Sequence, residues 1–216
     1  MKTLPLIAVA LAVCLPTGPC LAKAAKSHGK STAHKSAKHS QAKSADSSTW
    51  KPDPKLLSQL QPERAFGSYL MRIPKGYTVE EKITNIDGGQ IARYTFKGPA
   101  NADGSVPQMY IVTALAGPGY VALSVDTLFK NEKFLDDKPG LTVTDLQDGN
   151  DGALDLSREY FKFQDNTDKM QWVHGFRYAA TDSRTNIQII FGDQEPNNKT
   201  TLPLAEAAVL TLHKSE

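Results

Sequence analysis

The chain has 216 residues, 40% of them hydrophobic, and its 25 basic and 23 acidic residues give a formal net charge of +2. This length and apolar content suffice for one globular domain with a core of its own. Both cysteines, Cys14 and Cys20, lie in a segment that we predict to be removed, which excludes thiol catalysis, disulfides and cysteine-based zinc sites for the mature chain.

The first 22 residues have the pattern of a secretory signal peptide. Lys2 precedes an apolar run over residues 4–15, and helix-breaking and small residues follow it. The run is shorter than the roughly 20 residues that a membrane-spanning helix needs. Cys20 follows a proline, whereas a lipoprotein signal has a small residue before its cysteine. We therefore predict cleavage after Ala22, or two or three residues later, and an exported protein, periplasmic or secreted, without a transmembrane anchor.

Residues 23–49 are rich in Lys, Ser, Ala and His and have almost nothing apolar to bury, so we predict a disordered linker. Its positive charges are the candidate contacts for anionic envelope polymers, held weakly through counterion release. They are Lys23, Lys26, Lys30, Lys35, Lys38 and Lys43. Without aromatic or arginine side chains to stack on bases, the segment is not expected to recognise nucleic acid sequences.

Three histidines of this linker, His28, His34 and His39, are too widely spaced to form a compact site in a disordered chain, so we predict no metal and no cofactor. The lysines of residues 1–48 account for seven basic residues, and Asp46 for one acidic residue. From Thr49 onward, 18 basic residues therefore stand against 22 acidic ones, a net charge of −4. Binding to polyanions is accordingly assigned to the linker.

The remaining residues, 50–216, are predicted to form a single domain. Asp53 and Pro54 favour a short helix over residues 54–60, and residues 65–77 read as a strand that breaks at Pro74. Residues 81–86 and 90–97 flank an Asp-Gly-Gly turn, which indicates a hairpin.

Residues 108–116 are apolar on both alternating faces, which predicts a central strand with both faces covered. Ser124 is a candidate N-cap for an amphipathic helix over residues 124–137, which Pro139 and Gly140 would stop.

Four strand-like runs follow, at residues 141–147, 153–164, 170–181 and 186–192. The third carries Trp172, His174, Phe176 and Tyr178 on one face, and we expect Trp172 in the core. A closing helix is predicted from about Thr201. The fold class that results is α+β, an antiparallel sheet flanked by helices.

This order of elements, together with the Ile-Pro-Lys-Gly-Tyr step at residues 73–77, resembles the PsbP-like fold family over about residues 65–212. The family includes extrinsic proteins of photosystem II, a Ran-binding relative and many exported bacterial proteins. The resemblance implies a binding or assembly-accessory domain without known catalytic residues, and it transfers no ligand.

The sequence also lacks the common catalytic motifs, which favours a binding or accessory domain. No HExxH, GxSxG, GxxxxGK[ST] or GxGxxG pattern occurs. Residues 148–152 (DGNDG) start like a calcium loop, but the fifth and sixth positions are Gly152 and Ala153, so we interpret them as a hairpin turn. His213 is expected to interact with the end of the last helix, and His174 to be a hydrogen-bonded residue of a half-buried sheet face.

These observations predict an exported, non-enzymatic accessory or binding domain whose partner, a protein or an envelope component, is unknown. The alternative is a small exported hydrolase or transferase that uses His174 and carboxylates in a cleft.

Overall fold

The computed structural model describes residues 21–23, 50–86, 88–151, 154–165 and 171–215. Residues 1–20 of the predicted signal peptide and residues 24–49 of the predicted linker lie outside the described residues. None of the described helices is long and apolar enough to cross a membrane.

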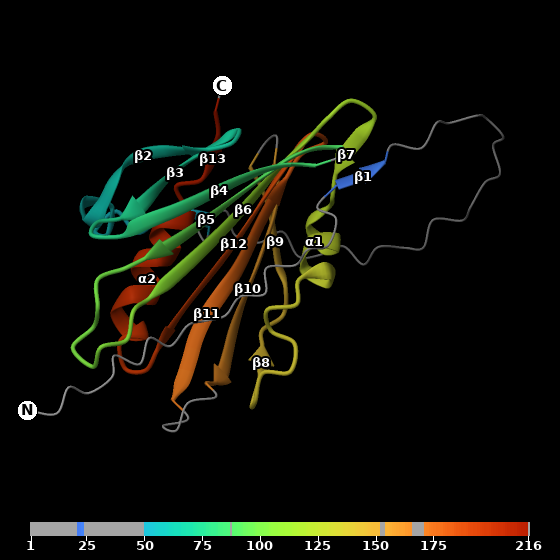
Figure 1. The fold of residues 1–216 in the computed structure, drawn as a ribbon. Helices are drawn as coiled ribbons and strands as arrows, with labels where there is room; N and C mark the ends of the chain where they lie inside the picture. The colour runs from blue at the N-terminus through green and yellow to red at the C-terminus, as the bar shows by residue number, and fades with distance from the viewer. Residues whose placement is uncertain (1–20, 24–49, 87, 152–153, 166–170, 216) are drawn as a thin grey trace, which may run out of the picture.

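An eight-stranded antiparallel sheet forms the body of the domain (Figure 1). Its strands run in the order β4-β5-β6-β12-β11-β10-β8, and β9 also pairs with β10. Their bounds are β4 Thr78–Ile86, β5 Gly89–Lys97, β6 Gln108–Ala116, β8 Thr142–Val143, β9 Gln147–Asp151, β10 Leu154–Gln164, β11 Trp172–Thr181 and β12 Thr185–Gln194.

One face of this sheet, here called the inner face, carries the main core. It is covered by helix α2 (Asn198–Val209) and by a small sheet in the order β13-β3-β2. The small sheet consists of β2 Leu60–Phe66, β3 Tyr69–Pro74 and β13 His213–Lys214. Period-two alternation places Ile111, Ile189 and Tyr178 in one row of the inner face, opposite one another on neighbouring strands.

The opposite, outer face of the sheet is covered in part by helix α1 (Val125–Asn131), whose Leu128 and Phe129 pack on Ala179 of β11. Ser124 caps this helix by accepting a hydrogen bond from the Thr127 amide. A short strand, β7 (Tyr120–Ala122), pairs with β1 (Leu21–Lys23). The predicted cleavage after Ala22 falls inside β1, so processing there would remove two of its three residues.

The structure confirms the α+β class and several predicted elements. The hairpin over residues 81–97 is β4 and β5, and the central strand is β6 with the predicted bounds. The runs at 153–164, 170–181 and 186–192 correspond to β10, β11 and β12.

The beginning of the domain differs from the prediction. The helix expected over residues 54–60 is only a 3-10 turn, η2 (Leu57–Gln59), because Leu60 is buried and already begins β2. The single strand expected over residues 65–77 is instead parts of two strands, because Gly67, with a φ of 61°, turns the chain so that Phe66 pairs with Tyr69.

Three further predictions differ from the structure in extent. Helix α1 ends at Asn131 and not at residue 137, since the buried Glu132 side chain turns to Arg177 and to the Phe134 amide. The hairpin turn predicted for the DGNDG segment does not begin at Asp148, and its last residue, Gly152, lies outside the described residues. Its first four residues belong to β9, where Asp148 accepts a 2.6 Å hydrogen bond from the Ser157 hydroxyl of β10. The closing helix starts three residues before the predicted Thr201, at Asn198.

Candidate functional site

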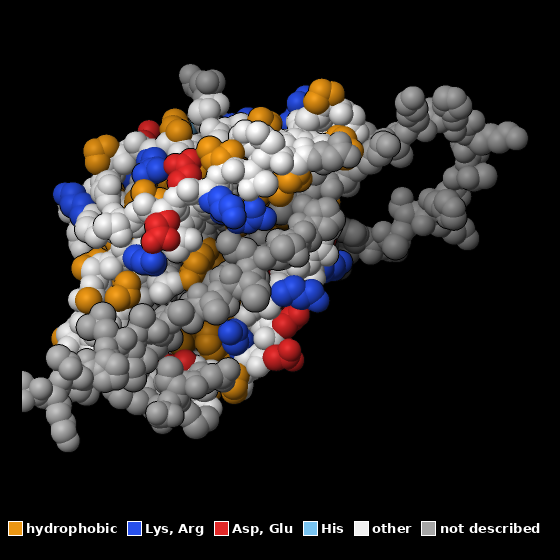
Figure 2. Space-filling model, in the orientation of Figure 1, with side chains coloured by type: hydrophobic (Ala, Val, Ile, Leu, Met, Phe, Trp, Pro, Cys, Tyr) orange, Lys and Arg blue, Asp and Glu red, His pale blue; other side chains and the backbone are white. Residues whose placement is uncertain are grey.

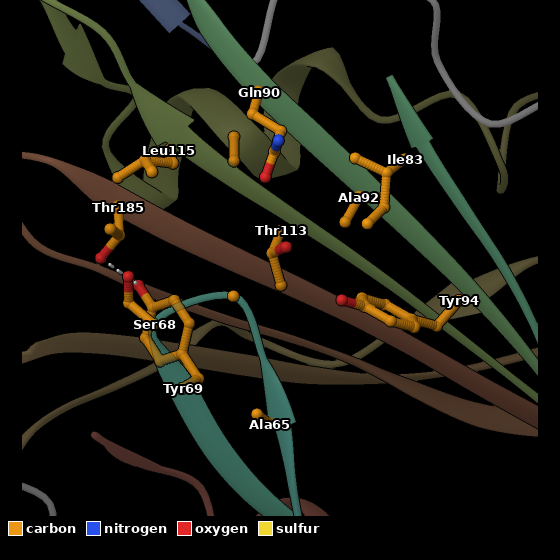
Figure 3. Close-up of a pocket in the computed structure, with 12 residues that line it drawn as sticks. Ala65, Ser68, Tyr69, Ile83, Gln90, Ala92, Tyr94, Thr113, Leu115 and Thr185 are labelled. Atoms are coloured by element: carbon orange, nitrogen blue, oxygen red, sulfur yellow. Dashed lines mark hydrogen bonds between the residues drawn. The ribbon is translucent and has the colours of Figure 1, made fainter. Parts of the chain in front are cut away.

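A pocket of about 420 Å³ opens on the inner face of the large sheet, beside the turn that joins β2 to β3 (Figure 3). Its floor and walls come from the neighbouring strands β4, β5, β6 and β12. The lining residues are Ala65, Gly67, Ser68, Tyr69, Ile83, Gln90, Ala92, Tyr94, Thr113, Ala114, Leu115 and Thr185.

The pocket exists because the cover of the inner face ends here. Further along β6, Met109 and Ile111 are fully buried in the main core. At Thr113 only the tip of the β2–β3 hairpin reaches the sheet: a Cβ atom on Gly67 would lie 3.3 Å from the Thr113 hydroxyl. A side chain at residue 67 would therefore crowd the floor, and its positive φ favours glycine in any case.

The polar groups of the pocket are neutral. The Tyr69 hydroxyl and Thr185 Oγ1 share a 3.0 Å hydrogen bond at one side, and burial raises the pKa of Tyr69 to about 12. Tyr94 points its phenol into the space from the opposite side (Figure 3), and burial, together with the nearby Glu81 carboxylate, raises its pKa as well. Both phenols therefore stay protonated near neutral pH.

The rim of the pocket is apolar and open to solvent. Ile83 on β4 is 55% exposed and Leu115 on β6 is 45% exposed, although both are large aliphatic side chains. Next to Ile83, Arg64 of β2 and Glu81 of β4 form a 3.3 Å ion pair that links the two sheets. The rim thus combines exposed aliphatic surface with an edge strand of the large sheet.

The buried charged side chains among the described residues lie outside the pocket lining and are ion-paired or hydrogen-bonded. On the outer face Arg177 donates to Glu132 at 2.8 Å and to Glu159 at 2.6 Å. Burial raises the pKa of Glu132, and its contacts with Arg177 offset this only in part. Asp193, whose pKa burial also raises, accepts a 2.7 Å hydrogen bond from Thr201. These groups hold elements together and do not face the pocket.

The histidines predicted as candidates do not line the pocket. His174 Nε2 lies 2.7 Å from Glu195 Oε1 and the histidine side chain is 28% exposed, as predicted for a hydrogen-bonded histidine of a half-buried sheet face. His213 belongs to β13, where its Nδ1 lies 3.0 Å from the Thr211 carbonyl oxygen. Among the described residues, no group of three or more His, Cys, Asp or Glu could hold a metal ion.

The other candidates are placed as follows. Of the six linker lysines, only Lys23 is described, as the last residue of β1, and the others lie outside the described residues. Trp172, which was expected in the core, is only half-buried. It is the first residue of β11, and the Lys162 ammonium lies 5.2 Å from the centroid of its ring. Sequence reasoning missed the pocket residues, because nothing in their pattern shows where the cover of the sheet stops.

No family model matches this chain, and no curated protein matches it. Among solved structures, it is similar to the solution structure of cyanobacterial PsbP (CyanoP) from Synechocystis sp. PCC 6803, with 11% sequence identity and a TM-score of 0.49. The match covers 74% of this chain and 94% of that chain. It is to the same fold family that the order of elements resembles, and it extends to neither a ligand nor a partner.

Proposed function

We propose that this protein is an exported, non-enzymatic binding domain that holds a partner protein at the inner-face pocket. The observation that carries the proposal is the pocket itself, with neutral hydroxyl and amide groups inside and the exposed side chains of Ile83 and Leu115 at its rim. A concave site with an aliphatic rim is suited to bury an apolar group of a partner.

The chemistry of the lining favours binding over catalysis. General acid–base catalysis needs a group that titrates near the working pH, and nucleophilic catalysis needs a nucleophile beside such a base. The lining holds no Asp, Glu, His, Cys or Lys, and the pKa of Tyr69 is about 12. These groups can orient a ligand by hydrogen bonds but are poorly placed to transfer protons at neutral pH.

The lysine-rich linker supplies the second part of the proposal, a tether to anionic envelope polymers. The linker joins the domain at Trp50, whose ring packs on Tyr178 with centroids 6.0 Å apart and lies 4.6 Å from the Arg158 guanidinium. We expect the full mature protein to bind a polyanion such as heparin weakly and with steep salt dependence, and a variant lacking residues 23–48 to lose that binding.

The pocket is tested by placing a photo-crosslinking amino acid at Leu115 of the exported protein in its own host. The matched control is Val143, which is 42% exposed on β8, at the other side of the large sheet. We expect Leu115 to give a discrete crosslinked product that Val143 does not give, and a charged side chain at Ile83 to suppress it. Equal crosslinking at both positions would contradict the proposal.

The alternative, a hydrolase or transferase using His174, is favoured by one observation, the hydrogen bond to Glu195 that could orient the ring. Replacing His174 by alanine separates the two hypotheses. If the protein is a binding domain, the His174→Ala variant should still crosslink at Leu115, with a yield proportional to its folded fraction. If the protein is an enzyme, the variant should lose its activity although its fold is intact.

A further inference from the structure

We infer that the partner segment is an extended, acidic peptide that adds to the edge of β4 as a further strand and inserts one apolar side chain into the pocket. The inference rests on the proposed function and specifies the ligand of the same site. Three features support it: the unpaired edge of β4, the row of side chains that leads from this edge into the pocket, and the uncompensated charges beside it.

Strand β4 is nine residues long and stands at the end of the large sheet, paired only with β5 among the described residues. In an antiparallel sheet, the outer edge presents backbone N–H and C=O groups along its length. The pocket lining has no charged side chain that could bind a free small molecule by an ion pair. Main-chain hydrogen bonds along β4 would supply the binding energy that the neutral pocket lacks.

The register fixes where a side chain of the added strand would point. Ile83 of β4 lies opposite Ala92 of β5, which lies opposite Thr113 of β6, and all three line the pocket. A residue of an added strand opposite Ile83 extends this row on the inner face, one strand spacing of about 4.8 Å further out. An aliphatic or aromatic side chain at that position would cover Ile83 and reach towards the pocket.

The neighbouring residues determine the charge of the ligand. Glu80 and Glu81 are already paired, with Lys97 at 2.9 Å and with Arg64. In contrast, Lys82 of β4 lies opposite Arg93 of β5 on the outer face, and neither forms an ion pair with a described residue. Like charges directly opposite one another repel, so an acidic side chain beside Lys82 would relieve this repulsion. Figure 2 shows basic and acidic side chains interspersed over the part of this face that is formed by β4 and β5.

A lysine on an edge strand normally discourages pairing with other chains. On β4, Lys82 would make strand pairing selective, because its charge disfavours basic and apolar strands and favours acidic ones. The inferred ligand therefore alternates acidic residues, which lie beside Lys82, with an apolar residue, which lies beside Ile83.

In the experiment, the mature protein is titrated with a nine-residue peptide whose two termini are chemically blocked. The peptide alternates glutamate with valine around a central leucine, and binding is measured by NMR chemical-shift changes and by calorimetry. A second peptide has lysine in place of glutamate, and a third is N-methylated at alternate backbone amides. We expect the glutamate peptide to bind at least about tenfold more tightly than the lysine peptide, and the N-methylated peptide to lose binding. The shifts should centre on β4.

Charge reversal by Lys82→Glu should remove or invert the preference between the two peptides. Lys130 on α1 is exposed and forms no ion pair with a described residue, so Lys130→Glu should leave the preference unchanged. Binding that tolerates N-methylation, or that is insensitive to Lys82→Glu, would overturn the inference. If Leu115 crosslinks a partner while none of the peptides binds, strand addition is wrong and the binding function stands. If neither occurs, both are wrong.

Discussion

The two halves of the inner face are built on the same strands, yet one is a packed core and the other is an open pocket. Along β6, Met109 and Ile111 are fully buried, whereas Leu115, a few residues further on, is 45% exposed. Leu115 is as apolar as Met109 and Ile111, so residue type does not explain the difference. What differs is the cover: α2 and β3 lie over the first half, and only the β2–β3 turn reaches the second. The candidate site therefore lies where the packing on this face of the sheet stops.

The largest effect that would test this comparison is expected from Phe191→Ala in the covered half. Phe191 is fully buried and stacks on Phe176 with ring centroids 5.7 Å apart. Its removal should lower the free energy of unfolding by about 3–5 kcal/mol, since it loses apolar burial and leaves a cavity. Urea denaturation followed by circular dichroism measures the change.

Ile83→Ala in the open half is the matched control and should cost no more than about 0.5 kcal/mol. Trp172→Ala should fall between the two, because Trp172 is only half-buried. Similar losses for Phe191→Ala and Ile83→Ala would mean that the two halves are equally packed, against the comparison.

A second, smaller effect concerns the outer face, where buried charged side chains lie beside the apolar contacts of α1. The Glu132 side chain is fully buried and shares Arg177 with Glu159. Glu132→Ala should destabilise by about 1–3 kcal/mol, because one donor of the buried guanidinium is left without its acceptor. Circular dichroism under urea measures it.

The same residue gives a pH dependence of known sign. Burial raises the pKa of Glu132 above 4.5 in the folded state, so the folded protein holds this proton to higher pH than the unfolded chain does. The stabilisation is complete below the unfolded pKa and is lost as the pH rises through the raised pKa. Relative to Glu132→Gln, which cannot titrate, wild type should therefore lose stability as the pH rises from the unfolded pKa of about 4.5 through the raised pKa of the folded state. Parallel curves for the two proteins would contradict this.

The strands of the large sheet could be predicted from sequence because burial on one or both faces leaves a local periodicity. The hairpin over residues 81–97 and the strands β6, β10, β11 and β12 followed from such patterns. Near the start of the domain the local signals conflict: Asp53 and Pro54 favour a helix, but pairing of Leu60 with Pro74 outweighs them. The Gly67 turn was overlooked because one glycine between two apolar runs does not reveal a hairpin.

The pocket could not be predicted for a related reason. Whether Leu115 is covered depends on how far a separate sheet reaches over β6, and that distance is set by long-range packing. Period-two patterns record which face a residue lies on, and they do not record what covers that face. His174, in contrast, was a candidate because histidine is a residue type that can act as a base. Its hydrogen bond with Glu195 could not be predicted from the local sequence.

A third prediction concerns Tyr69, which lies at the border between the covered half and the pocket. Tyr69→Phe removes the hydrogen bond with Thr185 and should cost about 1 kcal/mol near neutral pH. Because the pKa of Tyr69 is raised to about 12, wild type should lose up to roughly 3 kcal/mol as the pH rises from about 10 to about 12, and the variant should not lose this part. The urea midpoints of the two proteins should therefore approach each other as the pH rises and then cross, with the variant the more stable protein at the highest pH. A constant difference would mean that Tyr69 is not desolvated at this border.

The smallest effect on stability is expected from Leu115→Asp, at the rim of the pocket. A core position does not tolerate a charged side chain. Leu115, however, is 45% exposed, so an aspartate at this position can place its carboxylate in water. The free energy of unfolding should change by no more than about 0.5 kcal/mol. The crosslink from a probe at Ile83, which also lies at the rim, should nevertheless disappear, because a charge at the rim opposes burial of an apolar partner group. A loss of 2 kcal/mol or more on denaturation would show that Leu115 belongs to the core. The open half of the inner face would then be a continuation of the covered half, and no binding function could be argued from it.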